Sequence, residues 1–193
     1  MKDYWLLVRE PAAAIAKLKK HNMHATIKLL VASSLLFGAG ISVMVSKLLL
    51  LSGAFTAEVF IGLALTVFAL LVIIALAMAV VLEFIAINLG GSGRYYEALT
   101  AITALIAAPS LGIFIASLLL LVPFVGFFLG PFIIALTLGI GLSSFYRAVK
   151  EFFRVDMVTA FVAVSVFILS FFVLVYGALT LTVLSLSLPG IAF

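Results

Sequence analysis

The sequence contains no cysteine and very little charge. Only 9% of its 193 residues are charged and 67% are apolar, whereas a soluble domain is about one quarter charged and about one half apolar. The lack of cysteine excludes disulfides, thiolate metal sites and cysteine nucleophiles. The lack of charge excludes a water-facing surface over most of the chain, so a lipid environment is indicated.

Long apolar runs make up most of the sequence. In lipid every backbone amide must be satisfied internally, which leaves helices or a closed barrel, and unbroken runs of this length favour helices. The sequence therefore predicts an all-α, polytopic membrane bundle with five transmembrane helices in one domain, residues 27–193. The predicted spans are about 27–46, 59–87, 102–122, 127–146 and 157–188. A bend is expected near Pro109. The connection around Pro123 to Pro131 carries no charge, so the fourth span could begin anywhere from Phe124 to Phe132.

Residues 1–26 have a different composition and are predicted to form a separate basic segment. Pro11 suits a first helical position, and Ile15 and Leu18 recur at helical spacing while the lysines fall elsewhere. This pattern indicates a short amphipathic helix in the cytoplasmic interface. The layout of a cleaved signal peptide is lacking, so the segment is interpreted as part of the mature protein.

The distribution of lysine and arginine predicts the orientation. With five spans, only Lys47 falls in the flanks on one side, and the other ten basic residues fall in the flanks on the opposite side. Basic flanks favour the cytoplasm. The amino terminus is therefore expected inside and the carboxyl terminus outside. The ten residues are Lys2, Arg9, Lys17, Lys19, Lys20, Lys28, Arg94, Arg147, Lys150 and Arg154.

Glu83 is the only acidic residue inside an apolar run. A carboxylate in hydrocarbon is costly, so such a residue usually faces protein or water. With Asn88 close to the interface, Glu83 could pair with Arg94 or Arg147. The alternative is an intramembrane polar site of Glu83 and Asn88 in a small transporter or channel. The other polar residues considered for that role are Thr66, Thr100 and Thr103.

The turn Gly90–Gly93 matches the Gly-x-Ser-Gly pattern of intramembrane serine proteases. A serine nucleophile needs a base, and the only histidines, His21 and His24, precede the first span. Two histidines are also too few for a metal site. The turn is therefore interpreted as a helix stop and restart at Arg94, with a lipid phosphate bound by the glycine turn as a weaker hypothesis.

No phosphate-binding loop, catalytic carboxylate pair or zinc motif is recognisable. We predict no enzymatic activity, no cofactor, no metal and no nucleic-acid partner. The candidate contacts with anionic lipid or a protein partner are Lys17, Lys19, Lys20, Arg94, Arg147, Lys150 and Arg154, the last three in a predicted loop over 147–156. Small residues at close spacing predict internal packing or a homo-oligomer. They are Ser34, Gly38, Gly40, Gly126, Gly130, Gly139 and Gly141.

The stretch from Gly90 to Val125 combines the glycine turn, an aromatic helix start, Ala107-Ala108-Pro109 and an apolar span up to Pro123. It resembles the Yip domain family, and Glu10-Pro11 with Ala14 resembles the opening of microbial members. The resemblance implies five spans, a cytoplasmic amino terminus and a role in membrane organisation or vesicle-mediated transport. Eukaryotic members interact with Rab GTPases, so a small GTPase or membrane-complex protein is an implied partner. Their Asp-Leu-Tyr-Gly-Pro motif is missing here.

Overall fold

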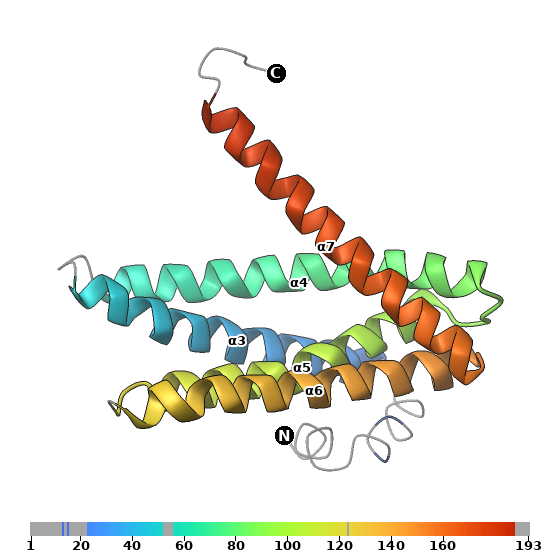
Figure 1. Ribbon diagram of the computed structural model, residues 1–193, viewed down its shortest axis with the longest axis horizontal. Helices are drawn as coiled ribbons and strands as arrows, with labels where there is room; N and C mark the ends of the chain where they lie inside the picture. The colour runs from blue at the N-terminus through green and yellow to red at the C-terminus, as the bar shows by residue number, and fades with distance from the viewer. Residues whose placement is uncertain (1–12, 14, 16–22, 52–55, 123, 188–193) are drawn as a thin grey trace.

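The computed structural model describes residues 13, 15, 23–51, 56–122 and 124–187 (Figure 1). These residues form five helices and no strand, and each helix is long and apolar enough to cross a membrane. The predicted all-α, five-span architecture is therefore confirmed, and the chain is a multi-pass integral membrane protein. The helices are α3 (Met23–Leu51), α4 (Ala57–Asn88), α5 (Tyr95–Leu119), α6 (Val125–Phe153) and α7 (Met157–Ser187).

Local interactions determine where α4 begins and ends. The hydroxyl of Thr56 accepts a hydrogen bond from the amide of Val59 at 3.3 Å, and Glu58 lies in the first turn. Such a cap satisfies one of the amides that a helix start leaves without a partner. The helix ends at Asn88, and Gly90 follows with a φ of +87°, a conformation that glycine adopts without strain.

The helix ends near the prolines differ from the predicted spans by only a few residues. Helix α6 begins at Val125, two residues before the predicted span of 127–146, and contains Pro131, so the connection that begins at Pro123 is shorter than predicted. Helix α5 runs through Pro109 and ends at Leu119, three residues before the predicted end of that span. A proline removes one amide donor and usually interrupts a helix in water. In a membrane bundle, neighbouring helices help to satisfy the carbonyl that the proline leaves without its donor.

The predicted loop over 147–156 is wrong, because α6 continues to Phe153. Helix formation here buries an apolar face, made of Ala148, Val149, Phe152 and Phe153, against the bundle. The charged residues of the segment occupy the opposite face of the same two turns. Only residues 154–156 connect α6 to α7.

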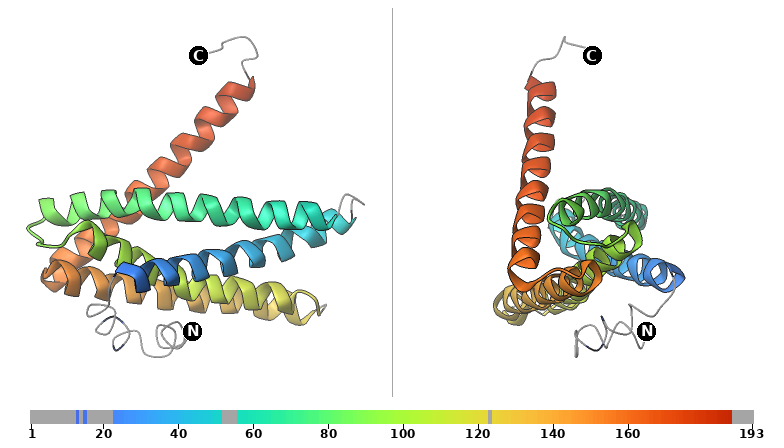
Figure 2. Two further views of the ribbon diagram at one scale, coloured as in Figure 1. Left: turned by 180° about the vertical axis from the view of Figure 1, so that it is seen from behind. Right: turned by 90° about the vertical axis from the view of Figure 1, so that its right-hand side faces the viewer.

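The helices run in alternating directions, and α7 departs from the rest (Figures 1 and 2). Its first half packs against α4 and α6, where the rings of Phe145 and Phe167 lie 5.0 Å apart between centroids. From Phe171 to Tyr176 every side chain of α7 is exposed. Residues 171–176 of α7 therefore lie away from the other helices in the described part of the chain.

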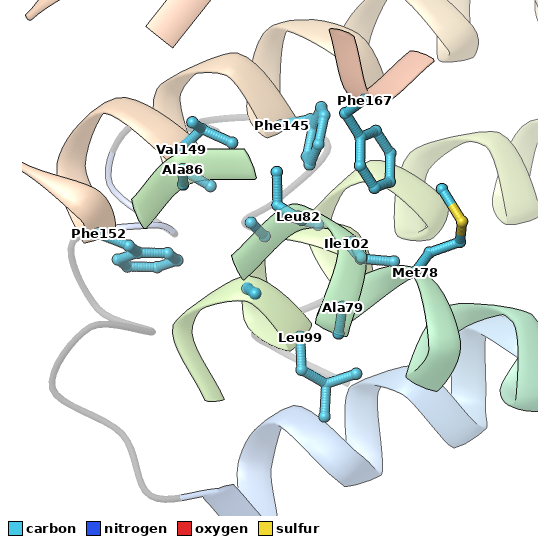
Figure 3. Packing of buried hydrophobic residues seen from close by; sticks show 14 of the residues in the cluster. Met78, Ala79, Leu82, Ala86, Leu99, Ile102, Phe145, Val149, Phe152 and Phe167 are labelled. Carbon is cyan, nitrogen blue, oxygen red and sulfur yellow. The ribbon is translucent and has the colours of Figure 1, made fainter. Parts of the chain in front are cut away.

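The apolar core lies at one end of the bundle. Buried residues of α4 begin only at Ala75, although the helix starts at Ala57. Figure 3 shows side chains of α4, α5, α6 and α7 meeting around Leu82. Ile15 is also fully buried in this cluster and Ala13 is exposed, while the predicted amphipathic helix otherwise lies outside the described residues. The end with the core is the one at which α4 connects to α5 and α6 connects to α7.

Small residues let α5 and α6 approach closely. A methyl group built on Gly112 would lie 2.7 Å from Cβ of Thr137, and one built on Gly141 would lie 2.6 Å from the carbonyl oxygen of Leu105. That carbonyl faces Pro109, which has no amide proton to offer. On Gly126 a methyl group would lie 2.5 Å from the carbonyl oxygen of Leu119. These glycines serve internal packing, whereas Gly139 faces open space.

Helix α3 packs in the same manner on both of its neighbours. Its Thr26 hydroxyl lies 3.1 Å from that of Thr100 on α5, and a methyl group on Gly40 would lie 3.0 Å from Phe114. On Gly38 it would lie 2.6 Å from the carbonyl oxygen of Ala64 on α4. The hydroxyls of Ser33, Ser34 and Ser42 are buried along these contacts without a partner among the described residues. Small side chains here bring the helix backbones together.

Candidate functional site: the basic end of the bundle

Most of the described charge lies at the end of the bundle that holds the core. This end, hereafter the basic end, carries five exposed cations at or near the ends of α3, α5 and α6. At the opposite end the described residues include one cation and one anion, Lys47 and Glu58. The cations of the basic end are Lys28, Arg94, Arg147, Lys150 and Arg154.

The two connections at the basic end are bonded to each other. The amide of Ser92 donates to the carbonyl of Phe153 at 3.0 Å. The Phe153 side chain is fully buried, and its ring lies directly against Gly93. Arg94 follows Ser92 by two residues and Arg154 follows Phe153, so this docking brings the two basic segments together.

The glycine turn has few amides left to hold a phosphate. The amide of Gly90 donates to Ile87 at 3.0 Å and that of Gly91 to Ala86 at 2.9 Å. The Ser92 amide is bonded to Phe153, and the Arg94 amide donates to the carboxylate of Glu97 at 2.7 Å. A phosphate-binding loop needs several unbonded amides pointing at one place. The weaker hypothesis of phosphate binding by this turn is therefore not supported.

Carboxylates occupy the N-termini of α5 and α7 at this end. Glu97 bonds the backbone at the start of α5, and Asp156 accepts from the amides of Val158 at 3.0 Å and Thr159 at 3.4 Å at the start of α7. The Thr159 hydroxyl and these amides lower the pKa of Asp156 below its ordinary value of 3.8. Because the positive ends of α5 and α7 carry their own acids, these two helix ends add little attraction for another anion, and the exposed basic side chains are the main source of it.

Three of those side chains share one face of α6. Arg147, Lys150 and Arg154 are spaced at i, i+3 and i+7, and all three are exposed. Arg154 terminates the helix in the left-handed conformation, with a φ of 55°. Glu151 lies on the flank of this face and has an interaction of its own. Within the described residues, neither Lys150 nor the two arginines form an ion pair.

The polar residues considered for an intramembrane site in α4, Glu83, Asn88 and Thr66, do not lie together. Glu83 is half-buried, and in the described part of the chain it forms no ion pair with Arg94 or Arg147. The Asn88 amide donates to its own helix at Phe84, at 2.7 Å. Thr66 lies 17 residues before Glu83, about 26 Å along the helix. The structure therefore does not bring Thr66 to Glu83.

The other two threonines considered for a polar pathway are engaged locally. Thr100 and Thr103 are buried in α5 and donate to the carbonyls of Tyr96 and Leu99, each at 2.8 Å. Hydroxyls bonded to their own helix in this way are common packing elements of membrane bundles. Lys17, Lys19, Lys20 and His21 lie outside the described residues.

Aromatic residues that the sequence analysis did not single out stabilise the basic end. The hydroxyl of Tyr146 donates to the carbonyl of Met157 at 3.1 Å and bridges α6 to α7, and the hydroxyl of Tyr95 donates to Leu76 at 3.2 Å. Phe153 has the docking role described above. The signal available in the sequence is the clustering of aromatic residues within one or two turns of each charged segment.

No family model, curated protein or solved structure matches this chain. The geometry and charge of the basic end are therefore the features of this chain that point to a function.

Proposed function

We propose that this protein is a non-enzymatic, multi-pass membrane protein of Yip type that acts in membrane organisation or trafficking. In this proposal the basic end faces the cytoplasm and binds anionic lipid. The observation that carries the proposal is the hydrogen bond from the Ser92 amide to the Phe153 carbonyl. It joins the segment that contains Arg94 to the segment that contains Arg154. The family resemblance adds the expected orientation and the trafficking role.

Electrostatics makes lipid the favoured ligand. Each lysine or arginine near an anionic leaflet contributes about 1 kcal/mol of attraction. Arg94, Arg147, Lys150 and Arg154 are all exposed at the same end of the membrane-spanning helices. In this proposal a protein partner, such as a small GTPase or a subunit of a membrane complex, would compete with lipid for this same surface.

The test measures binding of short-chain phosphatidylglycerol and phosphatidylcholine to the detergent-purified protein. We expect phosphatidylglycerol to bind more tightly. Replacing Arg147, Lys150 and Arg154 together by glutamine should weaken it by at least about tenfold, and Lys47→Gln, at the opposite end, should leave it unchanged. Equal affinity for both lipids would overturn the lipid proposal. Recovery of a protein from native membranes that depends on the same three residues would then favour a protein partner.

A second candidate function is a small transporter or channel that uses Glu83. One observation favours it, because this carboxylate is half-buried and has no ion pair with Arg94 or Arg147, and such intramembrane acids often carry protons or ions. The Glu83→Gln protein should then fold normally and lose pH-dependent flux in proteoliposomes. Flux equal to that of protein-free liposomes in the unmodified protein would eliminate this candidate.

A further inference from the structure

The outer face of α6 marks the edge of the hydrocarbon layer. Its exposed large apolar side chains extend from Val125 to Leu142, and the first exposed charge after them is Arg147. The twenty residues before Arg147, 127–146, measure about 30 Å in a helix, which is the thickness of a bilayer core. On this count Arg147 would lie where an α6 standing along the bilayer normal leaves the hydrocarbon, next to the lipid phosphates.

The remaining cations on this face lie progressively farther out. Lys150 is about 4.5 Å and Arg154 about 10 Å beyond Arg147 along the helix axis. The three charges form a ladder along the axis of α6. The helix thus offers one cation at phosphate depth and two in the headgroup layer.

The charge opposing this ladder is limited. Glu151 is the only acid within α6, and Asp156 is turned toward the amides of Val158 and Thr159. On the amino-terminal side of Arg147 the same face of α6 continues through Ser143 and Gly139, which are both exposed. A methyl group added to Gly139 would meet no atom within 4 Å, so no other described helix covers this position. An acyl chain can therefore lie against the helix directly beneath the ladder.

From this arrangement we infer that the outer face of α6 binds a phospholipid whose headgroup carries a phosphomonoester in addition to its phosphodiester. Arg147 contacts the phosphodiester, and Lys150 with Arg154 contacts the outer phosphate. A phosphomonoester carries about −1.5 to −2 charges at neutral pH, which matches two cations. Lipids with a single phosphate, or with two phosphodiesters at equal depth, leave the upper part of the ladder without a ligand.

This inference rests on the proposed function and is tested on the full chain in detergent with short-chain lipids. Phosphatidylinositol 4-phosphate should bind at least about tenfold more tightly than phosphatidylinositol. The double variant Lys150→Gln, Arg154→Gln should abolish this preference, because it should weaken phosphatidylinositol 4-phosphate much more than phosphatidylinositol. Arg147→Gln should weaken both lipids, and Lys47→Gln should change neither. Lys150→Arg should retain the preference, and thermal unfolding of each variant reports whether it is folded.

The outcomes separate the inference from the proposed function. Equal affinity for the two inositol lipids, both above phosphatidylcholine, would overturn the inference and leave the proposed function intact. No preference for any anionic lipid over phosphatidylcholine would overturn both. If the soluble headgroup, glycerophosphoinositol 4-phosphate, bound as tightly as the lipid, the site would be one for a soluble phosphate compound and the lipid inference would be wrong.

Discussion

The amide of Ser92 and the carbonyl of Phe153 are joined by a hydrogen bond of 3.0 Å that links the two connections at the basic end. The last carbonyls of a helix have no partner within the helix, so this bond satisfies one of them at the end of α6. It also fixes the glycine turn above a fully buried phenylalanine ring. Arg94 and Arg154 are consequently held by the fold and not by flexible loops.

Gly93→Ala is expected to disrupt this docking. The added methyl group would lie 2.8 Å or less from three atoms of the Phe153 ring, and the ring is buried and has little room to move. Overpacking of this kind destabilises by about 1–3 kcal/mol. The measurement is thermal unfolding of the purified protein in detergent, together with binding of phosphatidylglycerol, which should weaken in parallel.

A matched control for this variant is Gly139→Ala, because a methyl group there meets nothing within 4 Å. Alanine also has a higher helix propensity than glycine, so Gly139→Ala should not lower the melting temperature. Adding Phe153→Leu to Gly93→Ala should recover part of the lost stability. An unchanged melting temperature in Gly93→Ala would show that the turn does not pack on Phe153.

Gly112→Ala is expected to separate α5 from α6. Its methyl group would overlap the side chain of Thr137 near the middle of the contact between the two helices. A loss of about 1–3 kcal/mol in the free energy of unfolding is expected, measured by denaturation in mixed micelles. The control is Gly62→Ala on α4, where a methyl group meets open space. Equal behaviour of the two variants would contradict the close approach of α5 and α6.

Asp156 should make the stability of α7 depend on pH in the acid range. Because its pKa in the folded protein is lowered from 3.8, its stabilising effect is present above pH 3.8 and is lost as the pH falls through the lowered pKa. Asp156→Ala should therefore lower the melting temperature at neutral pH, and the difference from the unmodified protein should shrink only below pH 3.8.

Asp156→Asn is the control for the pH effect. Asparagine is also a good helix cap, so its melting temperature at neutral pH should fall less than that of the alanine variant. Its difference from the alanine variant should stay constant as the pH falls, because neither side chain titrates. A difference between Asp156 and alanine that persisted unchanged into strong acid would show that the ionised carboxylate does not stabilise α7.

The sequence was sufficient to predict the five spans and the start of α4. Apolar runs of sufficient length and the Thr56 cap act through local interactions, so they are visible without a tertiary structure. The extension of α6 to Phe153 was not predicted, because the charges of Arg147 and Lys150 were interpreted as a loop. Their spacing placed them opposite Ala148 and Phe152, which is a helical pattern.

The candidate site was predicted only in its composition. Arg94, Arg147, Lys150 and Arg154 were named from their charge, which is readable in the sequence. Their placement on one frame depends on the contact of Ser92 with Phe153, between residues 61 positions apart, and nothing local specifies that contact.

The orientation can be tested because the chain contains no cysteine, so a single introduced cysteine is the only thiol. Ser92→Cys lies at the basic end and Glu58→Cys at the opposite end, and both positions are exposed. With the basic end in the cytoplasm, a membrane-impermeant maleimide should label Glu58→Cys in intact cells and Ser92→Cys only after permeabilisation. The reverse pattern would place the basic end outside, away from the anionic cytoplasmic leaflet. Anionic lipid binding measured in detergent would then have no counterpart in the cell, so this labelling decides whether the proposed site meets its ligand.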